Sequence, residues 1–404
     1  MIQDALESEV SVGVDERVPK YRIREVRLDH PDVSTIVAAW KSCNDRYNND
    51  LIHNDPEWLL EFHKTGLENV RVFLLEENSK VVGAVSFLMS KAPLKFQYGG
   101  MVLGNISIRK WVMLGYTLSI PEDEEAYDLL FSRLQELAGE FDAIYCEYIR
   151  SDSFFWKYIH SSRQAKKSFQ LYSQYGSLPH PYVRVAGTFD EYMRYFPSKI
   201  RTERVRKLKK LHEQGDVELV RITSQAGVSA FVDTAAEIAR KSWQFSLLNT
   251  GFAALSTEAW NERLSFAAER GCLRSYILKC NGIPCAFELG YQYKRRFYFS
   301  LTGYDPSRSK LGVGATMIWL IIKDMFEHNR PEVCDFATYA DYKQSYANDS
   351  YPESMIWLFP RRTYPMMAFY LYRAYSATEI NGAALLERFN LKSKVKQFIR
   401  RMSS

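Results

Sequence analysis

The stretch GYDPSRSKLGVGATMIWLIIKDMFEHN, residues 303–329, decides the fold that we expect for this chain. An aromatic-rich run over 296–302 leads into it and is typical of a β-strand. A glycine-containing turn follows, and then an apolar helix over 312–328 and a buried strand over 333–338. Strand, turn, helix and strand in this order form a mixed α/β pattern.

The turn within this stretch, SRSKLGVGA, has the properties of an anion site. Gly312 and Gly314 would let backbone N–H groups approach a phosphate, and the positive end of the helix dipole favours an anion. Arg308 and Lys310 flank the turn, so a diphosphate-containing ligand would suit it. A plain strand-to-helix turn explains the same glycines, because a GxG motif by itself is weak.

The same order of elements occurs once more, half a chain length earlier. Residues 55–87 and residues 256–290 each contain a Trp, a helix-like run and two strand-like runs joined by a polar turn. Two pairs of matching residues, each 202 positions apart, mark this repeat: Trp58 with Trp260, and Ala84 with Ala286. The spacing predicts a duplicated α/β domain.

The two copies differ where a phosphate would bind. The first copy has SIPEDEEAYDLL at the helix start, and these carboxylates would satisfy the helix dipole and repel a diphosphate. We therefore expect no cofactor there and a degenerate copy that supplies one wall of an acceptor cleft. The predicted parts are a mobile tail (1–20), the degenerate domain (21–180), an active domain (181–375) and a basic amphipathic helix (376–404).

Composition excludes several classes of protein. The longest apolar run, residues 317–322, is far shorter than the roughly 20 residues of a membrane span. The acidic N-terminus does not resemble a signal sequence, so we expect a cytoplasmic protein. The six cysteines form no CxxC pair, and we expect buried free thiols and no metal site.

Positive charge is concentrated in two segments, 199–210 and 388–401, although the formal net charge is only +5. This distribution argues against a DNA-binding protein, but either segment can meet phosphate or anionic lipid. The first segment is predicted to be a solvated helix between the domains or to contact a phosphorylated acceptor. The second would dock on its own domain or lie on an anionic membrane surface.

Three motifs carry a family resemblance: PSKIRTERVRKLKKLHEQGDVEL, the glycine-containing stretch above, and VCDFATYADYKQSY. The region from Tyr182 to Phe359 resembles the CelD-like, cellulose-biosynthesis-associated branch of the GNAT acyltransferases, relatives of the Fem-type aminoacyltransferases. The resemblance implies two tandem GNAT-like domains, each a mixed, mostly antiparallel sheet flanked by helices, and transfer of an acyl group from acyl-CoA to an amine. The expected cofactor-binding residues are Arg308, Lys310, Leu311, Gly312, Val313, Gly314 and Ala315.

Acyl transfer to an amine needs a base, donors for the oxyanion and a proton for the leaving thiolate. Glu288 is the most natural base, and Asp335, Asp341 and Glu237 are weaker candidates. The catalytic set that we expect is Glu288, Tyr342, Lys343 and Tyr346, with a tyrosine as the acid and Lys343 at the oxyanion. Each has a plain alternative: an outward-facing strand carboxylate, tyrosines packed in the core, or a lysine stem that covers the sheet edge.

The expected acceptor-binding residues are Trp243, Gln244, Asn249 and Tyr339. The first hypothesis is an acyl-CoA-dependent N-acyltransferase that modifies a sugar, amino acid or peptide in cell-envelope or polysaccharide biosynthesis. In the second hypothesis, the donor is aminoacyl-tRNA instead of acyl-CoA, and the basic helix over 199–210 contacts the RNA. The third is a non-catalytic GNAT-like protein that binds a partner or a membrane.

Overall fold

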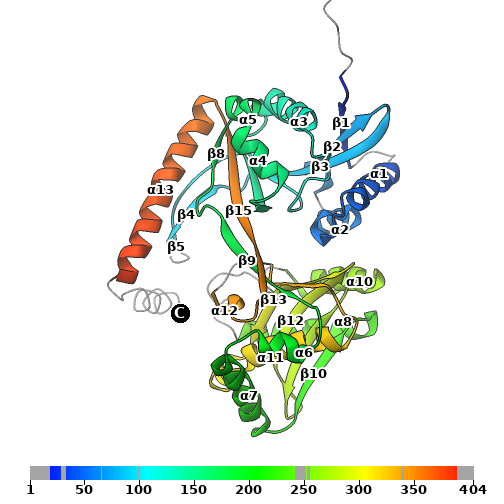
Figure 1. The fold of residues 1–404 in the computed structure, drawn as a ribbon, viewed down its shortest axis with the longest axis vertical. Coiled ribbons are helices and arrows are strands. Elements are labelled where there is room, and N and C mark those ends of the chain that lie inside the picture. The colour runs from blue at the N-terminus through cyan, green and yellow to red at the C-terminus, as the bar shows by residue number, and fades with distance from the viewer. Residues whose placement is uncertain are drawn as a thin grey trace, which may run out of the picture.

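The computed structural model describes residues 19–28, 33–64, 66–98, 101–241, 252, 255–337 and 341–388. Thirteen strands of these residues form one mixed sheet, which runs through two lobes and carries helices on its faces (Figure 1). A separate hairpin of β4 (Leu94–Tyr98) and β5 (Met101–Ile106) lies at the side of the upper lobe. The sheet is therefore the frame that positions both copies of the repeat.

The N-terminal copy occupies the upper lobe. Its elements are β1 (Arg22–Arg27), α1 (Val33–Arg46), α2 (Pro56–Phe62), β2 (Val70–Glu77), β3 (Lys80–Ser90), β6 (Lys110–Met113), α3 (Glu124–Glu136), β7 (Ala143–Arg150), α4 (Phe154–Ser161), α5 (Arg163–Ser168) and β8 (Phe169–Tyr172). Three elements connect the copies: β9 (Leu178–Arg184), α6 (Phe189–Arg194) and α7 (Ser198–His212).

The C-terminal copy follows the same plan. Its elements are β10 (Val217–Ile222), α8 (Val228–Arg240), α10 (Thr257–Glu269), β11 (Ser275–Cys280), β12 (Ile283–Tyr293), β13 (Arg296–Tyr304), the 3-10 helix η6 (Pro306–Leu311), α11 (Val313–Glu327), β14 (Val333–Asp335), α12 (Asp341–Gln344) and β15 (Asp349–Pro360). A last helix, α13 (Thr363–Arg388), packs back on the upper lobe (Figure 1).

Strand order confirms the predicted repeat of elements. The order β1-β2-β3-β6-β7 in one copy matches β10-β11-β12-β13-β14 in the other. In both copies successive neighbours are antiparallel until the last pair, β6 with β7 or β13 with β14, which is parallel. The fold class expected from the sequence, a mixed and mostly antiparallel α/β arrangement in two tandem units, is the one observed.

Alternating side chains of each strand feed two different cores, as a pleated sheet requires. In β12, Ala286 packs with α11 in one core, and its neighbour Phe287 packs with α8 and α10 in another. In β3, Val85 packs with α3 while Ala84 packs with α1. Each copy is thus a three-layer unit of helix, sheet and helix.

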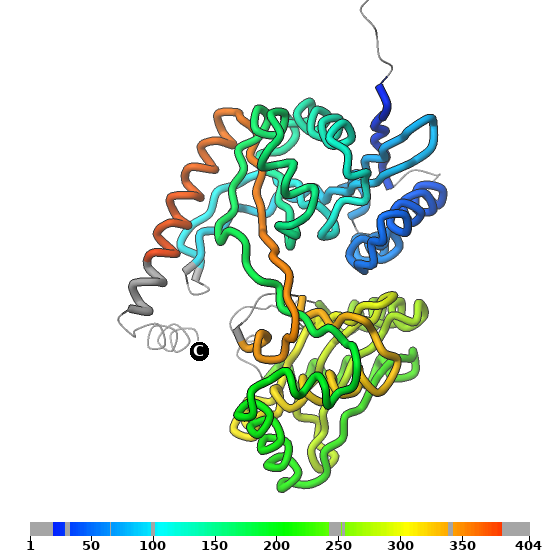
Figure 2. The backbone as a smooth tube through the Cα atoms, in the orientation of Figure 1, coloured from blue at the N-terminus to red at the C-terminus, as the bar shows by residue number. Residues whose placement is uncertain are grey.

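The copies exchange their last strands. β9, which follows the N-terminal copy, pairs with β14 of the C-terminal copy. β15 pairs with β9 over Asp349–Glu353 and then enters the N-terminal copy, where it lies between β7 and β8. Figure 2 shows these two strands as the long connections that cross between the lobes. Neither copy completes its sheet without the other.

This exchange bears on the domain boundaries expected from the sequence. The boundary at 180/181 falls inside β9, and the segment assigned to the C-terminal domain includes β15, much of which completes the N-terminal copy. The boundary at 375/376 is corrected, because α13 begins at Thr363 and runs through it. Local periodicity could not reveal an exchange between strands that are far apart in the chain.

Two further expectations concern the whole chain. All six cysteines are buried free thiols, as expected. None of the helices in the described ranges combines the length and the hydrophobicity that crossing a bilayer requires.

Candidate functional site

The glycine turn leaves the start of α11 without a side-chain cap. Gly312 ends η6 with a φ of 70°, a left-handed conformation that favours glycine, and no side chain caps the helix that begins after it. Thr316 N donates to Gly312 O at 2.9 Å, so the amides between these two residues precede the first bond of the helix. Gly314 has no such backbone requirement, because a Cβ there would meet Tyr304 at an ordinary 3.4 Å.

The predicted cofactor residues have different environments. Gly312, Gly314 and Ala315 are partly exposed at the helix start, and Lys310 is exposed beside them. Arg308 is half-buried, and Leu311 packs against the core beneath α11. Val313 is fully buried, so only its backbone could face a ligand.

The basic helix α7 supplies cations to this turn, a relation that the sequence did not predict. Lys207 Cδ lies 3.3 Å from the position of a Cβ on Gly312. Lys210 Nζ donates to Lys310 O at 3.0 Å. The segment interpreted as a solvated connector or as an acceptor contact therefore forms one wall of the predicted diphosphate site. The positive charge of this segment was the available signal, but the glycine turn that it contacts lies about a hundred positions further along the chain.

Tyr346 links this turn to the segment after β14. Its hydroxyl donates to Ala315 O at 3.1 Å, and the guanidinium of Arg204 lies 4.8 Å from its ring centre. Burial raises the pKa of Tyr346 to about 12. These contacts give Tyr346 a packing role and count against the predicted role as an acid.

Glu288, Tyr342 and Lys343 lie together where β13 and β14 diverge. The two strands pair only over Arg296–Tyr298, and Glu288 lies opposite Thr302, beyond that point. Lys343 Nζ donates at 2.6 Å to the carbonyl oxygen of Phe336, the residue after β14. The charge of Glu288 acts on both Tyr342 and Lys343. The structure thus brings three of the four predicted catalytic residues together.

Burial changes the acid–base character of this cluster. Glu288 is 1% exposed, and neither carboxyl oxygen has a hydrogen-bond partner among the described residues. Burial raises the pKa of Glu288 well above its ordinary value. Burial also lowers the pKa of Lys343, although the charges of Glu288 and Asp335 oppose that shift. Tyr342 is 49% exposed, and burial of its remaining surface raises the pKa of its phenol. A carboxyl group with a raised pKa is suited to proton transfer near neutral pH.

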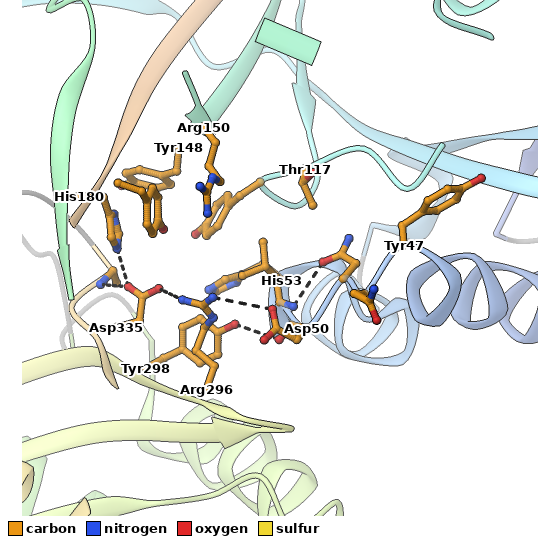
Figure 3. Close-up of a pocket in the computed structure, with 16 residues that line it drawn as sticks. Tyr47, Asp50, His53, Thr117, Tyr148, Arg150, His180, Arg296, Tyr298 and Asp335 are labelled. Atoms are coloured by element: carbon orange, nitrogen blue, oxygen red, sulfur yellow. Dashed lines mark hydrogen bonds and ion pairs between the residues drawn. The ribbon is translucent and has the colours of Figure 1, made fainter. Parts of the chain in front are cut away.

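The four residues predicted to bind the acceptor, Trp243, Gln244, Asn249 and Tyr339, lie outside the described residues. A cavity of about 300 Å³ between the two copies provides another place for an acceptor. Both copies line it, with Asp50 and His53 from the loop after α1, Tyr148 from β7, Arg296 from β13 and Asp335 from β14 (Figure 3).

A chain of buried and partly buried charges runs along this cavity. His180 in β9 lies between two carboxylates, with Nδ1 at 2.7 Å from Glu353 Oε2 and Nε2 at 2.8 Å from Asp335 Oδ1. Arg296 Nη1 donates to Asp335 Oδ2 at 2.9 Å, and Asp50 lies 3.8 Å beyond Nη2. Figure 3 shows His180 and Arg296 pointing at Asp335 from either side. The exchanged strands β9 and β15 bring His180 and Glu353 to this network.

Protonation in this network follows from its partners. Burial alone would lower the pKa of His180, but Asp335 and Glu353 outweigh it and raise the pKa to about 9. Burial alone would raise the pKa of Asp335, but His180 and Arg296 hold it well below the usual range. Nearby His53 is different, because burial lowers its pKa to about 4. The cavity therefore contains a protonated histidine and a neutral one at neutral pH.

Sequence reasoning ranked Asp335 as a weaker candidate and missed its partners. A carboxylate at the end of a buried strand was the available signal for Asp335. Along the chain, His180 lies 155 positions before Asp335 and Asp50 lies 285 positions before it, so no local pattern pairs them with Asp335.

Comparisons with known proteins give a family match for part of the chain and a similar fold for most of it. Residues 198–344 match the family model described as an acetyltransferase (GNAT) domain. No curated protein sequence matches the chain. The structure is similar to that of FemX, with a TM-score of 0.54, 12% identity and coverage of 83% of this chain and 97% of FemX. It is also similar to the C-terminal domain of a putative lysylphosphatidylglycerol synthetase from Agrobacterium fabrum, with a TM-score of 0.51, 11% identity and coverage of 84% and 95%.

The family match covers α7, the glycine turn and the cluster around Lys343, and the structural similarity extends over most of the chain. Residues 198–344 are therefore similar to a GNAT acetyltransferase domain, within a chain whose fold is similar to that of FemX.

Proposed function

We propose that the protein is an N-acyltransferase that moves an acyl group from acyl-CoA to a primary amine. The observation that carries this proposal is the uncapped, glycine-opened start of α11, with Lys207 and Lys310 beside it. Backbone amides at such a helix start, together with nearby cations, are suited to the diphosphate of coenzyme A. The thioester would then extend toward Glu288 and Lys343 in the gap between β13 and β14.

The reaction forms an amide bond and breaks the carbon–sulfur bond of the thioester. Glu288, directly or through a water, would accept the proton that the attacking amine loses. Lys343 would stabilise the oxyanion of the tetrahedral intermediate, and Tyr342 would give a proton to the leaving thiolate. Atoms balance, because the amine loses one proton and the thiolate gains one. A raised pKa of Glu288 favours this role over that of a permanently charged surface carboxylate.

The acceptor would bind in the cavity between the copies. Asp335 lines that cavity, and Lys343 donates to the carbonyl of the residue that follows Asp335, so the cavity and the catalytic cluster adjoin the same turn. Asp50 can attract an ammonium group, and the rings of His53 and Tyr148 offer flat polar walls. A sugar, amino acid or peptide amine is compatible with these walls. The CelD-like resemblance adds cell-envelope or polysaccharide biosynthesis as the proposed setting.

Thermal unfolding with acetyl-CoA, longer acyl-CoAs and free CoA tests the donor site. A ligand at a hundredfold its dissociation constant stabilises a protein by about 2.7 kcal/mol, which is readily measured. Gly314→Glu should abolish that response, because it places a carboxylate at the helix start where the backbone tolerates a side chain. Gly139→Glu is the matched control, since a side chain there meets nothing within 4 Å. A parent protein that no CoA species stabilises would contradict the proposal.

A second candidate is transfer from aminoacyl-tRNA. The observation that favours it is α7, which carries seven basic residues over 199–210 and reaches the donor turn through Lys207 and Lys210, in a fold similar to that of FemX. Salt-dependent tRNA binding that fails in an Arg206→Gln/Lys209→Gln variant, together with no response to CoA species, would select this candidate. Absence of both responses would favour the non-catalytic alternative.

A further inference from the structure

Helix α13 presents one face to the sheet and a largely uncharged stripe to solvent, with Arg373 exposed beside it. Its buried face is formed by Ala368, Phe369, Tyr372 and Ser376. The opposite face carries Tyr364, Met367, Tyr370 and Leu371, whose exposed fractions range from 42% to 60%. These four follow helical spacing, so they lie along one stripe. Ala374, Ala377 and Thr378 continue the stripe, all exposed and none of them charged.

The neighbouring hairpin extends this apolar surface. Phe96 of β4 lies 4.9 Å from the ring of Tyr375, and Gln97 N donates to the hydroxyl of Tyr375 at 2.7 Å. On β5, Val102 and Leu103 are 48% and 62% exposed. Seven of the thirteen large apolar residues exposed in the described part of the chain lie on α13 or β5. Such a concentration marks an interaction surface, because scattered single residues are the ordinary case.

Charge indicates what this surface meets. The sequence that follows α13, residues 389–404, contains five Lys and Arg residues and no Asp or Glu. A second copy of the chain docked by twofold symmetry would bring two of these cationic segments to one interface, where they would repel each other. A surface of anionic lipids would attract them, and Tyr and Leu side chains are suited to the headgroup region.

We propose that the exposed face of α13, together with β5, docks on an anionic lipid surface, with the helix lying in the plane of that surface. Docking this way leaves the interface between the lobes free, because α13 lies along the outer side of the upper lobe (Figures 1 and 2). The proposal does not depend on the acyl-transfer reaction.

Vesicle flotation of the full chain tests this docking. The protein should float with phosphatidylcholine vesicles that contain phosphatidylglycerol and remain behind with phosphatidylcholine alone. Met367→Glu/Leu371→Glu should weaken binding at least about tenfold, because both side chains would enter the headgroup region as charges. Val205→Glu is the matched control, since Val205 is exposed on α7 in the other lobe. Circular dichroism and the melting temperature verify that each variant is folded.

Two further variants identify the source of the charge attraction. Lys392→Gln/Lys394→Gln/Lys396→Gln should weaken binding to anionic vesicles, and Arg206→Gln/Lys209→Gln on α7 should leave it unchanged. The proposal is overturned if the Met367→Glu/Leu371→Glu variant binds as the parent does, or if the parent binds no anionic vesicle at low salt. It is also overturned if the parent is a dimer that this variant converts to a monomer, because the face would then join two copies.

Discussion

The starts of α3 and α11 occupy the same position in the two copies and differ in how their amides are satisfied. At α3, Asp123 accepts from Glu125 N at 3.0 Å and also binds Lys20 Nζ at 2.7 Å and the Tyr21 hydroxyl at 2.9 Å. At α11, Gly312 has no side chain, and Lys207 and Lys210 of α7 approach the turn. One fold therefore produces a closed helix start and an open one, and only the open one can accept an anion.

Removing one buried carboxylate from each copy should give the largest difference in unfolding free energy. Asp335 faces protonated His180 and Arg296, so Asp335→Ala leaves His180 with Glu353 alone and Arg296 with the more distant Asp50, and it should cost about 3–5 kcal/mol of unfolding free energy. Asp142 binds Arg109, a side chain that is 47% exposed and can turn to water. Asp142→Ala should therefore cost only about 1–2 kcal/mol. Denaturant titration of both variants measures the difference, and equal losses would refute a special buried network in the cavity.

Replacing one strand glutamate of each copy with glutamine tests which copy performs the acyl transfer. Glu288→Gln should lower kcat/KM by about a hundredfold or more, equivalent to about 2.7 kcal/mol, because it removes the proposed base. Glu147→Gln, in β7 of the N-terminal copy, removes a carboxyl whose pKa burial also raises and should leave the rate within about twofold. Steady-state kinetics with an accepted amine measures both. A fully active Glu288→Gln variant would exclude Glu288 as the base.

A pH series separates the network at His180 from exposed histidines. The pKa of His180 is about 9 in the folded protein and about 6.5 in an unfolded chain, so its contribution is complete below pH 6.5 and is lost as the pH rises through 9. The free energy of unfolding should fall by about 1–3 kcal/mol more over this window in the parent than in His180→Gln. His160→Gln, at an exposed position, should keep the slope of the parent. Parallel curves for the parent and His180→Gln would show that His180 is not held protonated.

The cap of α3 should give the smallest effect. Asp123→Ala removes an N-cap and should cost about 1 kcal/mol of unfolding free energy. It should leave the stabilisation by acyl-CoA unchanged, because the proposed donor site is at α11. Thermal unfolding with and without acyl-CoA measures both quantities. Loss of the acyl-CoA response in this variant would indicate a donor site in the N-terminal copy and would contradict the proposed site at α11.

Much of the fold could be predicted from local pattern. The expected helix over 312–328 is observed as Val313–Glu327, and the expected strand over 296–302 as Arg296–Tyr304. Glu288 and Lys343 were identified from their motifs, and the structure places them in one cluster. The hydroxyl of Tyr346 bonds to Ala315, about thirty positions away, and a spacing argument does not include such a contact.

The sequence by itself determined the repeat, the order of elements and the contrast between an acidic and a glycine-rich helix start, because each depends on residues that are neighbours in the chain. Only the tertiary structure decided the exchange of β9 and β15, the cavity between the copies and the chain from Glu353 to Asp50. These features need side chains separated by tens to hundreds of residues to meet in one buried place. Burial then sets their charges, and burial is a property of the packed chain rather than of any segment.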